Sequence, residues 1–230
     1  YNRNYLRCIF IYMILITSMG GCASTSFIAW TKNRVDCNCP LNSEGIRSAG
    51  PGSNPRGLKH RQSPPLQSDK SLFRENSFNR TDLKEGPIKR AIFLYDSPYN
   101  MVLSLFRRKI AMGHAIAVTG KRPTHNNNLD DFLEMGEDSF GFTDQFDAWT
   151  NKNTNCEYSR LLIKFDYLWE NLDFLLGYME IPNSEKSKFI RKHQRVNRMN
   201  DLTFDQKVKL KSIYSNLEKE MGAKPGMELI

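Results

Sequence analysis

The stretch that most constrains the fold is residues 12–27, with the sequence YMILITSMGGCASTSF. An apolar run typical of a buried strand passes into a loop of small and hydroxyl residues, and then into the start of a helix. Glycines let a backbone turn tightly and approach an anion, and the first turn of a helix presents unpaired N–H groups to it. The stretch therefore predicts a nucleotide phosphate cradle formed by Gly20, Gly21, Cys22, Ala23, Ser24, Thr25 and Ser26.

The same part of the chain has a second interpretation, as the leader of an exported protein. The apolar run 9–16 is too short to span a bilayer, but it has the length of a signal-peptide core, with Arg3 and Arg7 as its basic flank. Residues 19–22 (MGGC) resemble a bacterial lipoprotein cleavage box. Cleavage there would remove the cradle and leave a secreted or lipid-anchored protein. The isoleucine, tyrosine and phenylalanine content of the run favours the buried strand.

Composition narrows the class of ligand without selecting one. The 230 residues suffice for a single domain with a sizeable core, and the net charge of +8 suits phosphate or sulfate groups, nucleic acid or acidic surfaces. A basic nucleic-acid-binding protein is therefore an alternative, although no known RNA- or DNA-binding motif occurs. The Gly-Lys-Ser/Thr signature of P-loop ATPases and kinases is absent from the sequence.

The cysteines argue against a metal centre. Their number, five, is odd, and the pair Cys37 and Cys39 lacks the two-residue gap and the second ligand pair of a zinc site. We therefore expect mostly free thiols, no bound metal and a reducing, cytoplasmic location. If the N-terminus is truncated or is a signal, the Golgi lumen or secretion is the alternative.

The chain divides into a short first unit, a loop-rich stretch and an orderly remainder, which together predict one domain over residues 1–230. Residues 35–87 are rich in Gly, Pro, Ser, Asn and Arg, and predict loop or partly disordered chain. Beyond them we expect strands at 91–95 and 160–165, and helices at 99–112, 129–135, 142–149, 168–179, from Ser184, and at 202–221. Strands alternating with helices predict an α/β fold with a parallel sheet, whose ligands bind at the carboxyl ends of the strands.

Five segments occur in an order that is characteristic of one enzyme family. They are 24–27 (STSF); 58–60 (LKH) with 64–66 (PPL); 93–106 (FLYDSPYNMVLSLF); 131–133 (DFL) with Phe142, Phe146 and Trp149; and 161–168 (LLIKFDYL) with 174–175 (FL) and 181–182 (IP). In this order and spacing they resemble the sulfotransferases that use 3′-phosphoadenosine 5′-phosphosulfate. The resemblance covers most of the chain outside the loop-rich stretch. It implies a P-loop-like parallel sheet flanked by helices, in three α/β/α layers.

The resemblance also implies an activity, the transfer of a sulfuryl group from that nucleotide donor to a hydroxyl or amine of an acceptor. The acceptor is unknown; a carbohydrate or small molecule is expected, and protein tyrosine stays open. Residues 35–87 and 113–128 are expected to be loops that shape the acceptor site. No metal, nucleic-acid partner or stable membrane span is expected.

Individual roles follow from matching positions. His60 matches the catalytic histidine and would accept the acceptor's proton, while the carboxylates of Glu44 and Asp36 are alternative bases. The residues that match the grip on the donor's 3′-phosphate are Ser104, Arg191 and Lys192.

Three departures from the family pattern concern charge or backbone freedom. Cys22 stands where the family loop usually carries a Lys or Arg, Asp96 stands where it carries an arginine for the 3′-phosphate, and His193 replaces a glycine. The candidates to replace the missing cations are Arg107, Arg108, Arg191 and Lys192. The chain is therefore either a divergent enzyme or an inactive relative.

Overall fold

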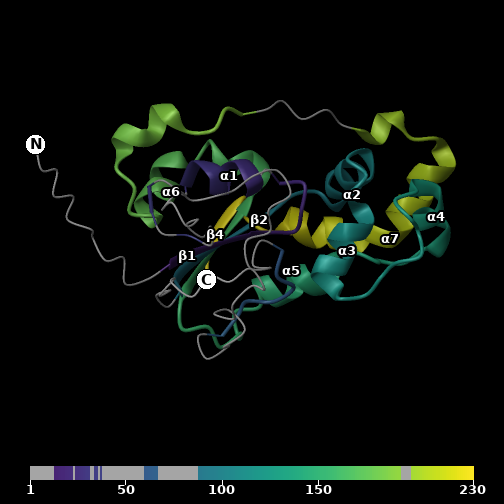
Figure 1. The fold of residues 1–230 in the computed structure, drawn as a ribbon, viewed down its shortest axis with the longest axis horizontal. Helices are drawn as coiled ribbons and strands as arrows, with labels where there is room; N and C mark the ends of the chain where they lie inside the picture. Colours follow the sequence, from purple (N-terminus) through teal and green to yellow (C-terminus); the bar gives the residue numbers. More distant parts are fainter. Residues whose placement is uncertain are drawn as a thin grey trace, which may run out of the picture.

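The computed structural model describes residues 13–22, 24–31, 34–35, 37, 60–66, 88–192 and 198–230. At their centre these residues form a four-stranded sheet of β1 (Met13–Ser18), β2 (Ile88–Tyr95), β3 (Ser159–Lys164) and β4 (Met227–Leu229), in which spatial order equals chain order (Figure 1). β1, β2 and β3 are parallel, whereas β4 pairs antiparallel with β3. The fold is α/β, as the sequence predicts, but the sheet is mixed, so the expectation of an all-parallel sheet is wrong.

Each parallel strand is a short apolar run that the fold buries. All six residues of β1 are buried, as are the last five of β2 and the middle four of β3. Strands that are covered on both faces have nearly continuous apolar sequences, and β-branched and aromatic side chains favour extended backbone. The three strands overlap the positions that the sequence predicts.

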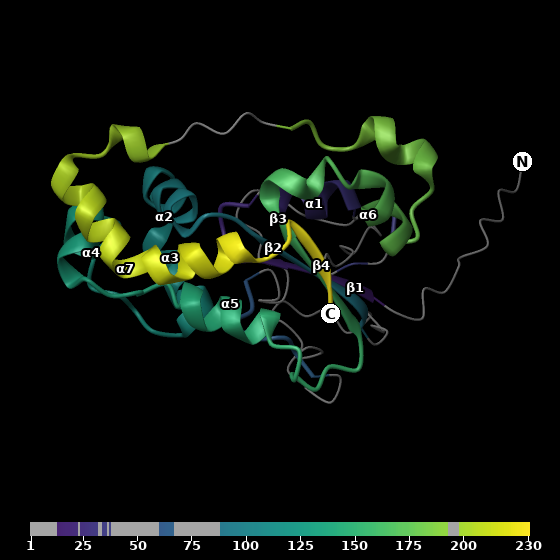
Figure 2. The same cartoon turned by 180° about the vertical axis from the view of Figure 1, so that it is seen from behind.

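Helices cover both faces of the sheet. α1 (Ser24–Thr31) and α6 (Leu172–Tyr178) lie on one face and α5 (Phe142–Thr150) on the other, as Figures 1 and 2 show. Trp149 of α5 stacks on Phe93 of β2, with ring centroids 5.0 Å apart and planes 3° from parallel. The sheet is thus buried between helices that approach it from both sides.

A second group of helices packs at one end of the sheet. It consists of α2 (Pro98–Arg107), α3 (Ala111–Thr119), α4 (Leu129–Met135) and α7 (Phe204–Ala223), and α7 contacts both α2 and α4 (Figure 1). Within it lies a cluster of rings from Phe106, His125, Phe132, Phe140, Phe142 and Tyr214. These rings, apart from that of His125, belong to the same apolar core as the strands.

Helices α4, α5 and α7 lie where the sequence predicts them, whereas other elements differ. The helix expected over 99–112 ends at Arg107 because Lys109 adopts the left-handed conformation, with φ 55°, and α3 begins at Ala111. The expectation of a loop over 113–128 is therefore wrong for residues 113–119, which belong to α3. The helix expected over 168–179 is reduced to α6, and the one expected from Ser184 is a 3₁₀ turn.

The strand β4 is an element that the sequence does not predict. It is three residues long and follows Pro225 and Gly226, which end the helical stretch of α7. Backbone hydrogen bonds in both directions between Arg160 and Ile230, each 2.8 Å long, extend its pairing with β3. Such a short strand is defined by the edge it pairs with rather than by its own side chains.

His125 gives the ring cluster a dependence on pH. Its side chain is fully buried, its Nε2 has no hydrogen-bond partner among the described residues, and burial lowers its pKa. Because an unfolded histidine has a pKa of about 6.5, its contribution to stability is complete above that pH and is lost as the pH falls through the lowered folded pKa.

Replacing His125 with phenylalanine should therefore flatten the acid branch of the stability curve, because phenylalanine keeps an aromatic ring against Phe106 and Phe132 and does not titrate. Urea unfolding of both chains at about pH 7 and about pH 5 measures this, since the loss of unfolding free energy between the two pH values should be smaller in the variant. Equal losses in the two chains would contradict the assignment.

Candidate functional site

The loop after β1, residues 19–22, is called the glycine loop here, and at Gly20 it leaves no room for a side chain. Gly20 and Gly21 have φ of 102° and 67°, which side chains disfavour. A Cβ on Gly20 would lie 2.6 Å from Cε1 of His114 in α3. A Cβ on Gly21 would lie 3.4 Å from the Cβ of Ser104 in α2. The backbone of the loop therefore lies directly against α2 and α3.

Hydroxyl groups occur along the segment that runs from the end of β1 through the glycine loop to the start of α1. The Ser18 hydroxyl donates to Ser24 Oγ over 2.9 Å and accepts from the Gly20 N–H over 3.4 Å. The Cys22 thiol donates to the Gly20 carbonyl over 2.9 Å. Ser24 opens α1 and is buried, while Thr25 is half-buried and Ser26 is exposed.

The glycine loop lies at the carboxyl edge of the sheet, where α/β folds bind ligands. The Met19 N–H donates to the Leu94 carbonyl over 3.1 Å, which joins the loop to the end of β2. The loop and the β2–α2 turn therefore meet at one edge, as the sequence predicts.

His60, 42 positions away from Ser18 in the sequence, lies against this loop. Its Nδ1 is 2.8 Å from the Ser18 carbonyl and 3.3 Å from Ser18 Oγ. A carbonyl only accepts hydrogen bonds, so we assign the ring proton to Nδ1, which makes Nε2 the basic nitrogen of the neutral imidazole. The His60 ring also contacts His114 edge-on, with centroids 4.6 Å apart. His114 is a site residue that no sequence motif marks.

Arg108 brings a positive charge to the same place. It follows α2 one turn after Ser104, and its Nε donates to the Ser104 carbonyl over 3.1 Å. Its pKa is lowered by burial first and by Arg107 second, and a smaller opposing effect comes from Cys22. Within the described part of the chain, no carboxylate forms an ion pair with Arg107 or Arg108. Arg108 is thus a largely exposed cation near Cys22 of the glycine loop, and no carboxylate among the described residues pairs with it.

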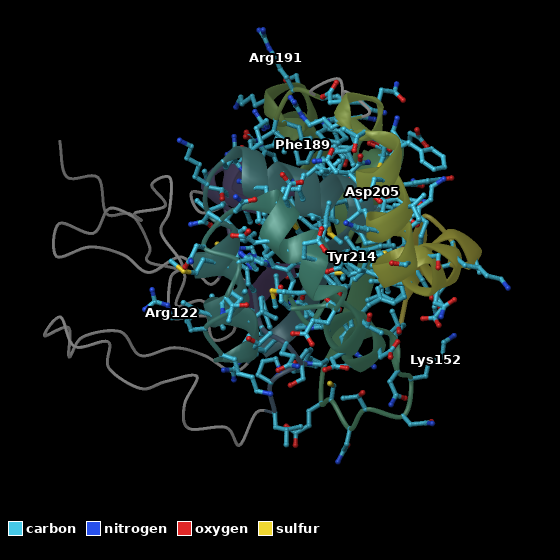
Figure 3. All side chains as sticks on the ribbon, turned by 90° about the vertical axis from the view of Figure 1, so that its right-hand side faces the viewer. Arg122, Lys152, Phe189, Arg191, Asp205 and Tyr214 are labelled. Atoms are coloured by element: carbon cyan, nitrogen blue, oxygen red, sulfur yellow. The ribbon has the colours of Figure 1, made fainter. Side chains whose placement is uncertain are left out.

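The other predicted cations are engaged elsewhere or point outward. Lys192 Nζ lies 3.9 Å from Glu170 Oε1 and over the Trp169 ring. Arg191 is exposed, and Figure 3 shows its side chain projecting away from the body of the protein. No described contact joins Arg191 or Lys192 to the glycine loop. Asp96, which follows β2, is 2 % exposed and adds a buried acid rather than a cation.

Several predicted positions lie outside the described residues. They are Ala23 of the cradle, the alternative bases Asp36 and Glu44, and His193. Among the residues that the structure describes, no group of three His, Cys, Asp or Glu side chains could hold a metal ion. None of the described helices combines the length and apolar character that a bilayer span requires.

Comparisons of the chain with models of protein families, with curated proteins and with solved structures return no match. Function must therefore be inferred from the site itself. The site consists of backbone N–H groups and hydroxyls around a glycine loop, a cation beside the loop, and a histidine with an assigned tautomer. Such a set can bind an anionic ester and accept a proton next to it.

Proposed function

We propose that this protein is a sulfotransferase with a P-loop-like, three-layer fold, which moves a sulfuryl group from 3′-phosphoadenosine 5′-phosphosulfate to a hydroxyl or amine. One observation carries the proposal. The glycine loop, Ser104 and His60 come from three distant sequence segments with separate expected roles, and they gather at one edge of the sheet. If the serines and threonine after the loop only capped α1, or if His60 were only a surface residue, the three segments would have no reason to lie together.

The donor's phosphosulfate would be held by the hydroxyls at the start of α1 and by N–H groups of the glycine loop. The Gly20 N–H would exchange its long hydrogen bond to Ser18 Oγ, 3.4 Å, for one to the anion. Ser104 lies beside Gly21, where an added Cβ would meet its side chain at 3.4 Å, and would donate to a phosphate of the same nucleotide. Arg108 would supply the cation that Cys22 and Asp96 do not. The attraction of a bound anion would offset the two effects that lower its pKa, which are desolvation and the repulsion from Arg107.

In the transfer, the bond between sulfur and the 5′-phosphate oxygen breaks, and a bond between sulfur and the acceptor oxygen or nitrogen forms. The bonding electrons leave with the phosphate oxygen, which gives adenosine 3′,5′-bisphosphate, and the acceptor's proton passes to His60 Nε2. Donors fixed around the leaving oxygen stabilise its growing charge, while His60 raises the nucleophilicity of the acceptor.

The test is calorimetric titration of the full chain with adenosine 3′,5′-bisphosphate and, in parallel, with ATP. We expect a micromolar dissociation constant for the bisphosphate and no measurable binding of ATP. The Ser104→Ala and Arg108→Gln variants should bind the bisphosphate about 10- to 100-fold more weakly, because hydrogen bonds to charged groups contribute about 1.5–3 kcal/mol. Arg107→Gln, a matched change at the neighbouring position, should change the affinity by no more than about twofold.

Each result has a distinct meaning. Equal binding of ATP and the bisphosphate, or binding of neither, would refute the nucleotide proposal. Equal losses in Arg107→Gln and Arg108→Gln would refute the specific role of Arg108 and indicate a general effect of positive charge.

A further inference from the structure

A second set of contacts, away from the glycine loop, fixes the backbone beside His60. The Arg61 carbonyl accepts hydrogen bonds from Gln145 Nε2 over 2.7 Å and from Trp149 Nε1 over 3.0 Å. Four residues along the chain, the Pro65 carbonyl accepts from the Tyr158 hydroxyl over 2.7 Å. The segment that carries His60 is thus held by side chains of α5 and of the residue before β3.

The two donors on Arg61 lie one helical turn apart on α5, and both are 0 % exposed. Gln145 is an unfavourable residue to bury, because its Oε1 has no hydrogen-bond partner in the described part of the chain. A methionine of similar shape would pack there without that penalty. The amide therefore contributes something other than packing, and its Nε2 donates to the residue next to His60.

The helix that carries these donors is itself firmly held. The Trp149 ring stacks on Phe93 in the centre of the sheet. Arg160 of β3 donates from Nη1 to the Trp149 carbonyl and from Nη2 to the Asn151 carbonyl, both over 2.8 Å. Since β2 pairs with both β1 and β3, Ser18 and the donors on Arg61 are fixed to the same sheet.

We propose that Gln145 and Trp149 are positioning residues, which hold the Arg61 carbonyl so that the His60 ring stays against Ser18 with its proton on Nδ1. The proposal rests on the proposed function, because that tautomer puts the basic lone pair on Nε2, the nitrogen that would accept the acceptor's proton. When the two donors are removed, the His60 segment is free to shift, and the Nδ1–Ser18 hydrogen bond becomes longer or is lost.

The experiment uses the full chain with nitrogen-15-labelled histidine, and long-range proton–nitrogen spectra that distinguish protonated from unprotonated ring nitrogens. The variants are Gln145→Met, Trp149→Phe and the double variant; each removes a donor and keeps an apolar side chain in its place. Tyr178→Phe is the matched control, because it removes a hydroxyl that donates to the Ala91 and Ser159 carbonyls and does not touch residues 60–66.

In the unchanged chain and in Tyr178→Phe, the His60 signals should show the proton on Nδ1. In the double variant, the signals of the two ring nitrogens should shift towards those of a mixture of tautomers. Transfer of the sulfuryl group from the donor to water, measured as hydrolysis of the donor, should slow by about 10- to 100-fold. Affinity for the bisphosphate should stay within about twofold, since neither residue lines the glycine loop.

A double variant that keeps the tautomer of the unchanged chain would overturn the proposal. If circular dichroism shows that the double variant does not fold, Gln145→Met alone decides by the same spectrum. Failure of the unchanged chain to bind the bisphosphate would refute the proposed function instead, and the tautomer spectrum would still report on positioning.

Discussion

Replacing Gly20 with alanine is expected to lower the free energy of unfolding by about 2–5 kcal/mol, the sum of backbone strain and overpacking. At φ 102° an alanine Cβ is strained whatever the surrounding space. The added methyl would also lie 2.6 Å from Cε1 of His114, whose ring is buried and packs against Phe140 and Phe142. That ring cannot move away without disturbing the cluster behind it. Urea unfolding followed by circular dichroism measures the change.

The matched control is Gly113→Ala in α3, one residue before His114. A Cβ there meets no atom within 4 Å, and alanine favours helix over glycine by about 0.5–1 kcal/mol, so this variant should be slightly more stable than the unchanged chain. The double change Gly20→Ala with His114→Ala removes the clash and leaves the backbone strain. Equal stability of Gly20→Ala and the unchanged chain would show that the glycine loop does not pack as described.

Replacing Trp149 with alanine is expected to lower the free energy of unfolding by about 3–5 kcal/mol, the range for large aromatic residues in cores. The side chain is fully buried, stacks on Phe93 in the central strand, and donates to the Arg61 carbonyl. Its loss would open a cavity beside the sheet and leave a backbone carbonyl with one donor fewer. Thermal and urea unfolding both measure the effect.

Trp169→Ala is the comparison for this second prediction. Trp169 is half-buried, contacts Phe165 edge-on with centroids 4.9 Å apart, and donates to the Ile190 carbonyl. The chemical change is identical, but less apolar surface leaves the core, so the loss of stability should be clearly smaller. An equal or larger loss than in Trp149→Ala would mean that the core is not centred on β2 and α5.

The local pattern of apolar residues and glycines was sufficient to predict the helices and strands whose own sequences show it. The apolar run and glycines of residues 13–22 predict a strand and a turn, and the periodic apolar residues of α7 predict a long helix. α3 is not predicted because its exposed face carries Ile116 and its sequence contains Gly113, so its apolar residues do not show an amphipathic helical pattern. β4 escapes it because three residues cannot show a period.

The site was predictable only where a motif marks it. The glycine loop follows from small residues between a strand and a helix, whereas the approach of His60 follows from a resemblance rather than from any local pattern. Arg108 could be selected from the candidate cations only once the end of α2 was known, because the chain there turns the Arg108 side chain back towards Ser104. Gln145 and Tyr158 carry no sequence signal, because a buried polar residue is recognised only through the partner it meets in the folded chain.

The order of strands in the sheet has a consequence for how the protein folds. Met13 pairs with Ile88, Arg90 with Ser159, and Leu161 with Leu229, so each pairing joins residues about 70 positions apart. None of these pairings is a hairpin, so a long loop must close, at a cost in chain entropy, before the contacts of each pairing can form. Topologies of this kind fold slowly. The glycine loop has local hydrogen bonds, but it packs against α2 and α3, which lie far along the chain. A peptide of residues 13–31 should therefore not retain its conformation, and the site should form only as the whole sheet assembles.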